Sequence, residues 1–142
     1  MINKLFSLAL LILCVQSLRA QSLDTITFRH LLKADKEEFL SYAKSARLVT
    51  SYDTLAETLF AKTEDCLYAK PTGTKNDNEN YALALIVSTR NKDNNKLILK
   101  NASEVPNQKG FWADNEYLYA EWDMENPISK VMWYKVLIYK RK

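Results

Sequence analysis

The segment YALALIVSTR at residues 81–90 constrains the fold more than any other part of the chain. One side of its alternating pattern holds Tyr81, Leu83, Leu85 and Val87, and the other holds Ala82, Ala84 and Ile86. Side chains alternate between the two faces of a β-strand, so both faces of this strand are apolar. Such a strand is typical of the interior of a sheet, either packed on both sides or with its small alanines under a helix. We therefore expect a central strand here.

Two segments near the carboxyl terminus also alternate, at residues 117–124 and 131–139. In the first, Leu118, Ala120, Trp122 and Met124 fall on one face, and Tyr117, Tyr119, Glu121 and Asp123 fall on the other. Asn126 and Pro127 are typical turn residues between the two segments. Strands joined by a short turn pair in antiparallel fashion, so the sequence predicts a hairpin at the end of the chain.

A helix is predicted at residues 36–46, before the strands. Asp35 precedes it, and Glu38 follows three residues later, which is the capping-box pattern. Apolar residues then recur at spacings of three and four, at Phe39, Leu40, Ala43 and Ala46. We expect Thr27 to cap a shorter helical turn upstream.

These segments predict an α+β fold, in which an amino-terminal helix packs on an antiparallel sheet of about five strands. Residues 66–70 predict a strand that ends at Pro71 and Gly73. Residues 48–65 fit a helical stripe or a strand, and we favour an irregular strand. Residues 97–109 fit either the second arm of a hairpin or a second short helix, whose length Pro106 limits.

The first 20 residues, MINKLFSLALLILCVQSLRA, predict a signal peptide with cleavage between Ala20 and Gln21. The apolar run is too short for a good membrane span, so we expect no stable span after cleavage. Cys14 does not favour a lipoprotein anchor, because Ile12 and Leu13 precede it where a small residue is usual. We expect one domain at residues 21–142, exported to the periplasm or the cell exterior.

Removal of the predicted signal changes the composition of the chain. Without Lys4 and Arg19, 18 basic residues face 17 acidic ones, so no strong positive field remains to attract nucleic acid. Cys66 becomes the single cysteine, so no internal disulfide can form. We interpret Cys66 as a small buried apolar residue in a strand.

Residues for catalysis and cofactor binding are scarce. Gly73 and Gly110 are the only glycines, which excludes glycine-rich phosphate loops. His30 is the only histidine, which excludes most zinc enzymes. We predict no cofactor, no metal site and no catalytic residue. Glu121 and Asp123 project from one side of a predicted strand and leave open a small hydrolase as a less favoured function.

Aromatic residues are concentrated towards the carboxyl terminus. Three tryptophans and four tyrosines lie between Phe111 and Tyr139: Trp112, Trp122, Trp133, Tyr117, Tyr119, Tyr134 and Tyr139. If the last two strands pair, Tyr117, Tyr119, Trp133 and Tyr139 are predicted to share a face opposite the core. Grouped aromatic side chains on an open sheet can bind sugars or a partner protein. The alternative is that these rings only cover the sheet, since strands favour aromatic residues.

The leading functional hypothesis is a non-enzymatic binding or interaction module for a protein or a carbohydrate. An inhibitor of a secreted enzyme is the alternative. The segment FRHLLKADKEEFLSYAKSAR at 28–47, KGF at 109–111, the basic end at 140–142 and the Ala20–Gln21 junction together resemble small uncharacterised exported proteins of Bacteroidota. The resemblance implies export and an α+β order of elements, and it implies no activity and no functional residues.

Overall fold

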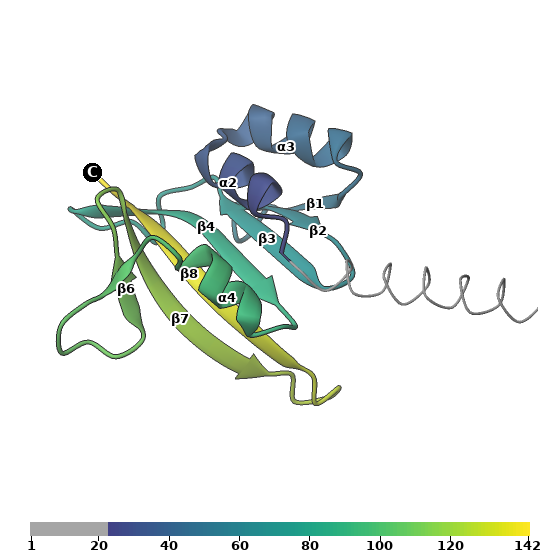
Figure 1. Ribbon diagram of the computed structural model, residues 1–142. Coiled ribbons are helices and arrows are strands. Elements are labelled where there is room, and N and C mark those ends of the chain that lie inside the picture. The colour runs from purple at the N-terminus through teal and green to yellow at the C-terminus, as the bar shows by residue number, and fades with distance from the viewer. Residues whose placement is uncertain (1–22) are drawn as a thin grey trace, which may run out of the picture.

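The computed structural model describes residues 23–142, which contain three helices and eight strands (Figure 1). In chain order, the elements are α2 (Thr25–Lys33), α3 (Lys36–Ser45), β1 (Val49–Asp53), β2 (Thr58–Lys62), β3 (Cys66–Pro71), β4 (Tyr81–Thr89), α4 (Asp93–Ile98), β5 (Ser103–Glu104), β6 (Phe111–Ala113), β7 (Tyr117–Glu125) and β8 (Met132–Arg141). The predicted signal peptide, its cleavage site and Cys14 lie outside the described residues.

The strands form one antiparallel sheet in the order β1-β2-β3-β4-β8-β7-β6-β5. Strand β4 pairs with β3 on one side and β8 on the other, which confirms the predicted central strand. The packing predicted with it is wrong, because within residues 23–142 the helices cover the face of Leu85 and Val87 and not the face of Ile86. Strands β7 and β8 pair from Tyr117 opposite Lys140 to Glu125 opposite Met132, which confirms the predicted hairpin. Strand β4 and the two strands of the hairpin, β8 and β7, therefore lie next to one another in the interior of the sheet.

The predicted helix on a sheet of about five strands is wrong, because the sheet has eight strands and two helices precede it. Residues 48–65 form two regular strands, β1 and β2, rather than one irregular strand. Asp53 closes the turn between them, since its Oδ1 accepts hydrogen bonds from the backbone N–H groups of Leu55 and Ala56. Strands β5 and β6 have only two and three residues, which is too short for alternation to be recognised.

A short helix does occur after β4, but it lies at Asp93–Ile98 rather than within 97–109. Downstream, the chain forms β5 and β6, joined by a turn that contains Pro106. Asn107 and Gly110 adopt positive φ angles of 62° and 82° in this turn. Proline lacks the N–H that a helix interior needs, and left-handed residues reverse the chain, so this segment forms a turn rather than a helix.

The amino-terminal helices begin at aspartate caps. The predicted capping box of α3 is confirmed: Asp35 Oδ1 accepts a 2.9 Å hydrogen bond from the Glu38 N–H, and the Glu38 carboxylate accepts one from the Asp35 N–H. The cap of α2 is Asp24 rather than Thr27. Asp24 accepts hydrogen bonds from the Ile26 N–H and from the hydroxyl of Thr27, so Thr27 supports the cap from inside the helix.

All three helices lie on one face of the sheet (Figure 1). Their apolar side chains meet strand residues that are completely buried, and the core includes Leu31, Phe39, Ala43, Leu85, Val87, Val136 and Ile138. Burial of each large apolar side chain contributes roughly 1.5–3 kcal/mol, so this layer supplies much of the stability. We call the sheet face under the helices the covered face.

An amine from the sheet fastens α2 to β3. Lys70 on β3 donates hydrogen bonds from Nζ to the backbone carbonyls of Leu31 and Leu32, at 3.4 Å and 3.1 Å. These carbonyls lie in the last turn of α2, where a cation also suits the helix dipole. Burial lowers the pKa of Lys70 to about 8.

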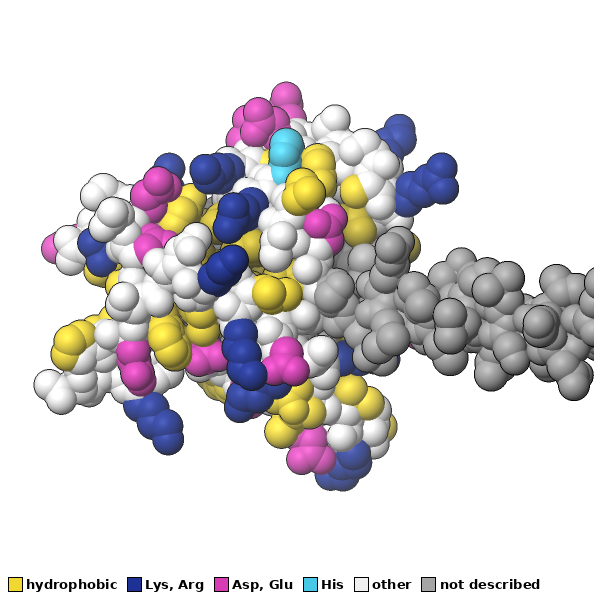
Figure 2. Space-filling model, viewed as in Figure 1, with side chains coloured by type: hydrophobic (Ala, Val, Ile, Leu, Met, Phe, Trp, Pro, Cys, Tyr) yellow, Lys and Arg dark blue, Asp and Glu magenta, His cyan; other side chains and the backbone are white. Residues whose placement is uncertain are grey.

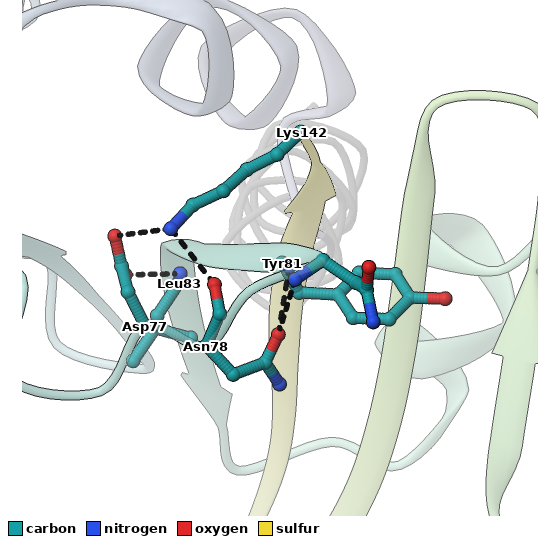
Figure 3. Close-up of polar contacts among 6 residues, drawn as sticks. Asp77, Asn78, Tyr81, Leu83 and Lys142 are labelled. Carbon is teal, nitrogen blue, oxygen red and sulfur yellow. Dashed lines mark hydrogen bonds and ion pairs between the residues drawn. The ribbon is translucent and has the colours of Figure 1, made fainter.

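The end of the chain is attached to the loop before β4 (Figure 3). Lys142 Nζ donates a 2.8 Å hydrogen bond to the Asn78 carbonyl and lies 3.6 Å from Asp77 Oδ2. Within the loop, Asn78 Oδ1 accepts from the Tyr81 N–H, and Asp77 Oδ1 accepts from the Leu83 N–H. These contacts fix the start of β4, next to an irregularity in its pairing with β8 between Leu83 and Leu85.

The opposite side of the sheet, which we call the open face, carries an apolar row that no helix covers; within it Ala69 is buried, Phe60, Ile86, Leu137 and Ala120 are half-buried, and Phe111 is exposed. Directly paired residues lie on the same face of an antiparallel sheet. By this register an apolar row crosses from β2 to β6 through Phe60, Ala69, Ile86, Leu137, Ala120 and Phe111. Within residues 23–142, the helices pack on the covered face only. Figure 2 views the helical side, where acidic and basic side chains are interspersed.

Candidate functional site

The four aromatic residues predicted to form a binding face do not share one face. Tyr139 is paired with Leu118, and Trp133 is paired with Met124, which places both rings on the open face. Tyr119 is paired with Ile138, a completely buried core residue. The prediction of one shared aromatic face is therefore wrong, and the set divides into two pairs.

Tyr117 and Tyr119 belong to the core, with exposed fractions of 7% and 5%. The Tyr119 hydroxyl donates a 2.7 Å hydrogen bond to Asp114 Oδ2. Burial, together with this hydrogen bond, raises the pKa of Tyr119 above its ordinary value. The alternation along β7 identified its two faces correctly, but the helices cover the tyrosine face rather than the face that carries Leu118 and Trp122.

Trp133 lines a pocket on the open face with a volume of about 720 Å³. The pocket lies where β1, β2 and β3 meet the end of β4 and the start of β8, and it is lined by Arg47, Val49, Ser51, Phe60, Lys62, Thr63, Glu64, Leu67, Arg90 and Trp133. This volume falls within the range of about 300–1,000 Å³ that small-molecule sites occupy. We call it the Trp133 pocket.

The strand register explains how the pocket wall is built. Val49 on edge strand β1 is paired with Lys62 on β2, and Ser51 is paired with Phe60. Lys62 is also paired with Leu67 on β3. Paired residues point to the same side, so these strands present apolar, hydroxyl and cationic side chains together on the open face.

Three cationic side chains line the pocket, against one carboxylate from Glu64. Arg90 lies over the Trp133 ring at 5.2 Å from its centroid and 3.9 Å from Asp65 Oδ1. Across residues 23–142, no ion pair engages Arg47 or Lys62. The pocket therefore holds an excess of positive charge beside apolar side chains.

Arg47 reaches the pocket from a strained position. The backbone N–H of Leu48 donates to the Ala43 carbonyl at 2.8 Å, and that of Arg47 donates to the Lys44 carbonyl at 3.1 Å. These bonds form the Schellman motif that ends α3, with Arg47 at φ 58°. Glycine is the usual residue at this left-handed position, and a residue with a Cβ costs roughly 1–2 kcal/mol there.

Glu121 and Asp123, the carboxylates of the hydrolase hypothesis, lie on the covered face beside α4. Both Glu121 carboxylate oxygens accept hydrogen bonds, from Asn95 Nδ2 at 3.2 Å and from Trp112 Nε1 at 3.0 Å. Asp123 forms an exposed ion pair with Lys92 at 3.2 Å. Glu121 also lines a second pocket of about 600 Å³ with Trp112 and Leu99. Protein donors therefore already engage both carboxylates.

The sequence alone did not identify most residues of the Trp133 pocket. Val49 and Lys62 come from residues 48–65, whose strands were ambiguous, and Arg47 directly precedes that region. All three line the same pocket as Trp133 only through the sheet order. The alternation of Val49 with Ser51, and of Phe60 with Lys62, is the signal that predicts a mixed apolar and cationic face.

Comparison of the chain with protein-family models, curated proteins and solved structures gives no match. Within residues 23–142, no helix is long and apolar enough to cross a membrane. The same residues contain no group of three or more His, Cys, Asp or Glu side chains placed to hold a metal ion. The geometry of the Trp133 pocket is thus the main guide to function.

Proposed function

We propose that this protein is an exported, non-enzymatic binding module whose ligand occupies the Trp133 pocket. One observation carries the proposal: a pocket of about 720 Å³ brings three cations and an aromatic ring together on the uncovered face of the sheet. Binding sites commonly combine an apolar lining with a few convergent polar groups in this way.

The scaffold suits a binding site that keeps its shape. Six of the ten lining residues lie on β1, β2, β3 or β8, and the other four, Arg47, Thr63, Glu64 and Arg90, lie in the turns beside these strands and β4. Core residues of β4 and β8 are completely buried. Sites on rigid strands hold their side chains more accurately than sites on loops, and this lowers the entropy cost of binding.

Glu121 and His30, which have side chains suited to acid–base catalysis, form contacts within the protein instead. Glu121 accepts hydrogen bonds from Asn95 and Trp112. His30 stacks on Tyr42, with ring centroids 4.1 Å apart. A general acid or base needs a titratable group within hydrogen-bonding reach of a substrate, and these contacts favour binding over catalysis.

Two tryptophans on the open face provide a matched test. Trp133 lines the pocket, whereas Trp122 lies on β7 outside the pocket and is 64% exposed. A panel of neutral oligosaccharides, short peptides and alkyl carboxylates is titrated into ¹⁵N-labelled protein, and backbone amide shifts are followed at residues 47–51, 60–67 and 133. We expect at least one compound class to shift these amides and to saturate.

The W133A variant should weaken that binding by about tenfold or more, because it removes the largest ring in the pocket. The W122A variant should leave it unchanged. Far-ultraviolet circular dichroism and thermal melting establish that both variants fold. Equal loss in both variants, or no compound that shifts the pocket amides, contradicts the proposal.

A further inference from the structure

The charge and the lining of the Trp133 pocket define the chemistry of its ligand. We infer that the pocket binds an anionic amphiphile, with a carboxylate or phosphate head at Arg47 and Lys62 and an alkyl body along the open face. This inference rests on the proposed function and goes beyond it by naming the ligand class.

The head group follows from the charges. Arg90 is engaged by Trp133 and Asp65, whereas neither Arg47 nor Lys62 has an ion-pair partner within residues 23–142. Even with Glu64 counted, cations exceed anions in the lining. A cleft lined mainly by one sign of charge concentrates ligands of the opposite sign, and hydrogen bonds between ionised partners are the stronger ones.

Arg47 also occupies the C′ position of the Schellman motif with φ 58°, where glycine or asparagine is usual. Lys130 has the same φ angle outside the pocket, so this conformation does not by itself indicate a function. Arg47 differs from Lys130 because it lines the Trp133 pocket.

The apolar body follows from the register. Phe60 belongs both to the pocket lining and to the apolar row of the open face. From Phe60 the row continues without a polar residue through Ala69 and Ile86 to Leu137. An alkyl chain that starts beside the pocket cations can therefore remove from water the surface of Phe60, Ile86 and Leu137 that remains exposed. A neutral sugar would neither cover the apolar row nor form an ion pair with Arg47 or Lys62.

The test uses the purified chain and a soluble probe, sodium decanoate, titrated by isothermal titration calorimetry at pH 7.5 below its critical micelle concentration. Decyltrimethylammonium, with the same alkyl chain and a positive head, is the charge control. We expect decanoate to bind with one-to-one stoichiometry and the cation to bind at least about tenfold more weakly.

Two glycine variants separate binding from folding. R47G removes a cation from a left-handed position in the pocket, and K130G removes a cation from a left-handed position, φ 58°, in the turn before β8. Glycine accepts this conformation without strain, so neither variant should lower the melting temperature through its backbone. We expect R47G to weaken decanoate binding by about tenfold and K130G to leave it unchanged.

A vesicle experiment distinguishes a free amphiphile from a lipid head group. The protein is sedimented with vesicles of phosphatidylglycerol or of phosphatidylcholine. Binding of decanoate that depends on Arg47, without sedimentation, identifies a free amphiphile. Sedimentation with phosphatidylglycerol alone that is lost in R47G identifies a membrane lipid as the source of the same chemistry.

Equal affinities for decanoate and decyltrimethylammonium, or equal effects of R47G and K130G, overturn the inference. If a saccharide or peptide shifts the pocket amides while decanoate does not bind, the inference fails and the proposed function stands. If no compound reaches the pocket amides, both fail.

Discussion

The hydroxyl group of Tyr119 donates a 2.7 Å hydrogen bond to Oδ2 of Asp114, and the two residues are joined by a tight turn. Oδ1 of Asp114 accepts two further hydrogen bonds, from the backbone N–H groups of Glu116 and Tyr117. The two carboxylate oxygens of Asp114 thus connect the turn between β6 and β7 to the start of β7. Tyr119, expected on a binding face, is instead a structural residue.

Replacing Tyr119 with phenylalanine should destabilise the fold without changing ligand binding. The ring remains packed in the core, but the hydrogen bond to Asp114 is lost, which costs about 1 kcal/mol for a partly exposed acceptor. Urea denaturation measures the free energy of unfolding. Y139F is the control, because no hydrogen bond of the Tyr139 hydroxyl occurs within residues 23–142. Equal stability of Y119F and Y139F would contradict the structural role.

Asp114 should make stability depend on pH. Burial opposes its ionisation, but the Tyr119 hydroxyl and the two N–H groups outweigh burial, so its folded-state pKa lies below the ordinary value of 3.8. A carboxyl with a lowered pKa stabilises the fold above its unfolded pKa and loses this effect as pH falls through its folded pKa. The stability difference between the wild type and D114N should therefore be largest near pH 7 and shrink below pH 3.8. A stability difference between the wild type and D114N that stays constant from pH 7 to below pH 3.8 would contradict a lowered pKa of Asp114.

Glu121 and Asp123 should differ in their effects on stability, although they are two residues apart on the same face of β7. Asn95 is only 2% exposed and donates to Glu121, so E121A leaves a buried amide without its acceptor. We expect a loss of about 2 kcal/mol in urea denaturation. D123A removes an exposed ion pair with Lys92 and should destabilise the fold much less than E121A does. The reverse order would exclude the structural role of Glu121.

The thiol of Cys66 should be inert in the folded protein. Cys66 is buried on β3, which confirms its interpretation as a small apolar strand residue, and burial raises the pKa of the thiol to about 11. The thiolate is the reactive form, so little of it exists at pH 8. Ellman's reagent should react slowly with the native protein and at once in urea. Rapid reaction of the native protein argues against this burial.

Segments with a long and regular pattern were predictable from the sequence. Strand β4 is apolar on both faces from Tyr81 to Val87, and the capping box of α3 needs only Asp35 and Glu38, three residues apart. Both features depend on residues close together in the sequence, so their patterns can be recognised independently of the tertiary contacts of the rest of the chain. Strands β5 and β6 are too short to carry such a pattern, and they form because β7 provides a partner.

The covered side of β7 was not predictable from its alternation. One face offered Leu118 and Trp122 and the other Tyr117 and Tyr119, and both faces are apolar enough to pack. The helices determine the outcome, because they cover the tyrosine side and leave Trp122 exposed. A local pattern contains no information about which face a distant helix will cover.

The candidate site was predictable only in part. Trp133 was named as a binding residue and lines the pocket, but the pocket cations Arg47, Lys62 and Arg90 lie 86, 71 and 43 residues earlier in the chain. Arg47 and Lys62 line the same pocket as Trp133 only because the sheet order places β2, β3, β4 and β8 side by side. This sheet order depends on long-range pairing, which the sequence pattern of a single strand does not specify.

Fluorine NMR of protein labelled with 5-fluorotryptophan tests the binding site most directly. The three tryptophans, Trp112, Trp122 and Trp133, give separate signals that single substitutions to phenylalanine assign. During titration with decanoate, the Trp133 signal should shift and saturate while that of Trp122 stays in place, and R47G should move the midpoint to about tenfold higher concentration. A Trp133 signal that does not respond, or a response of Trp122 alone, would contradict a ligand site in the Trp133 pocket.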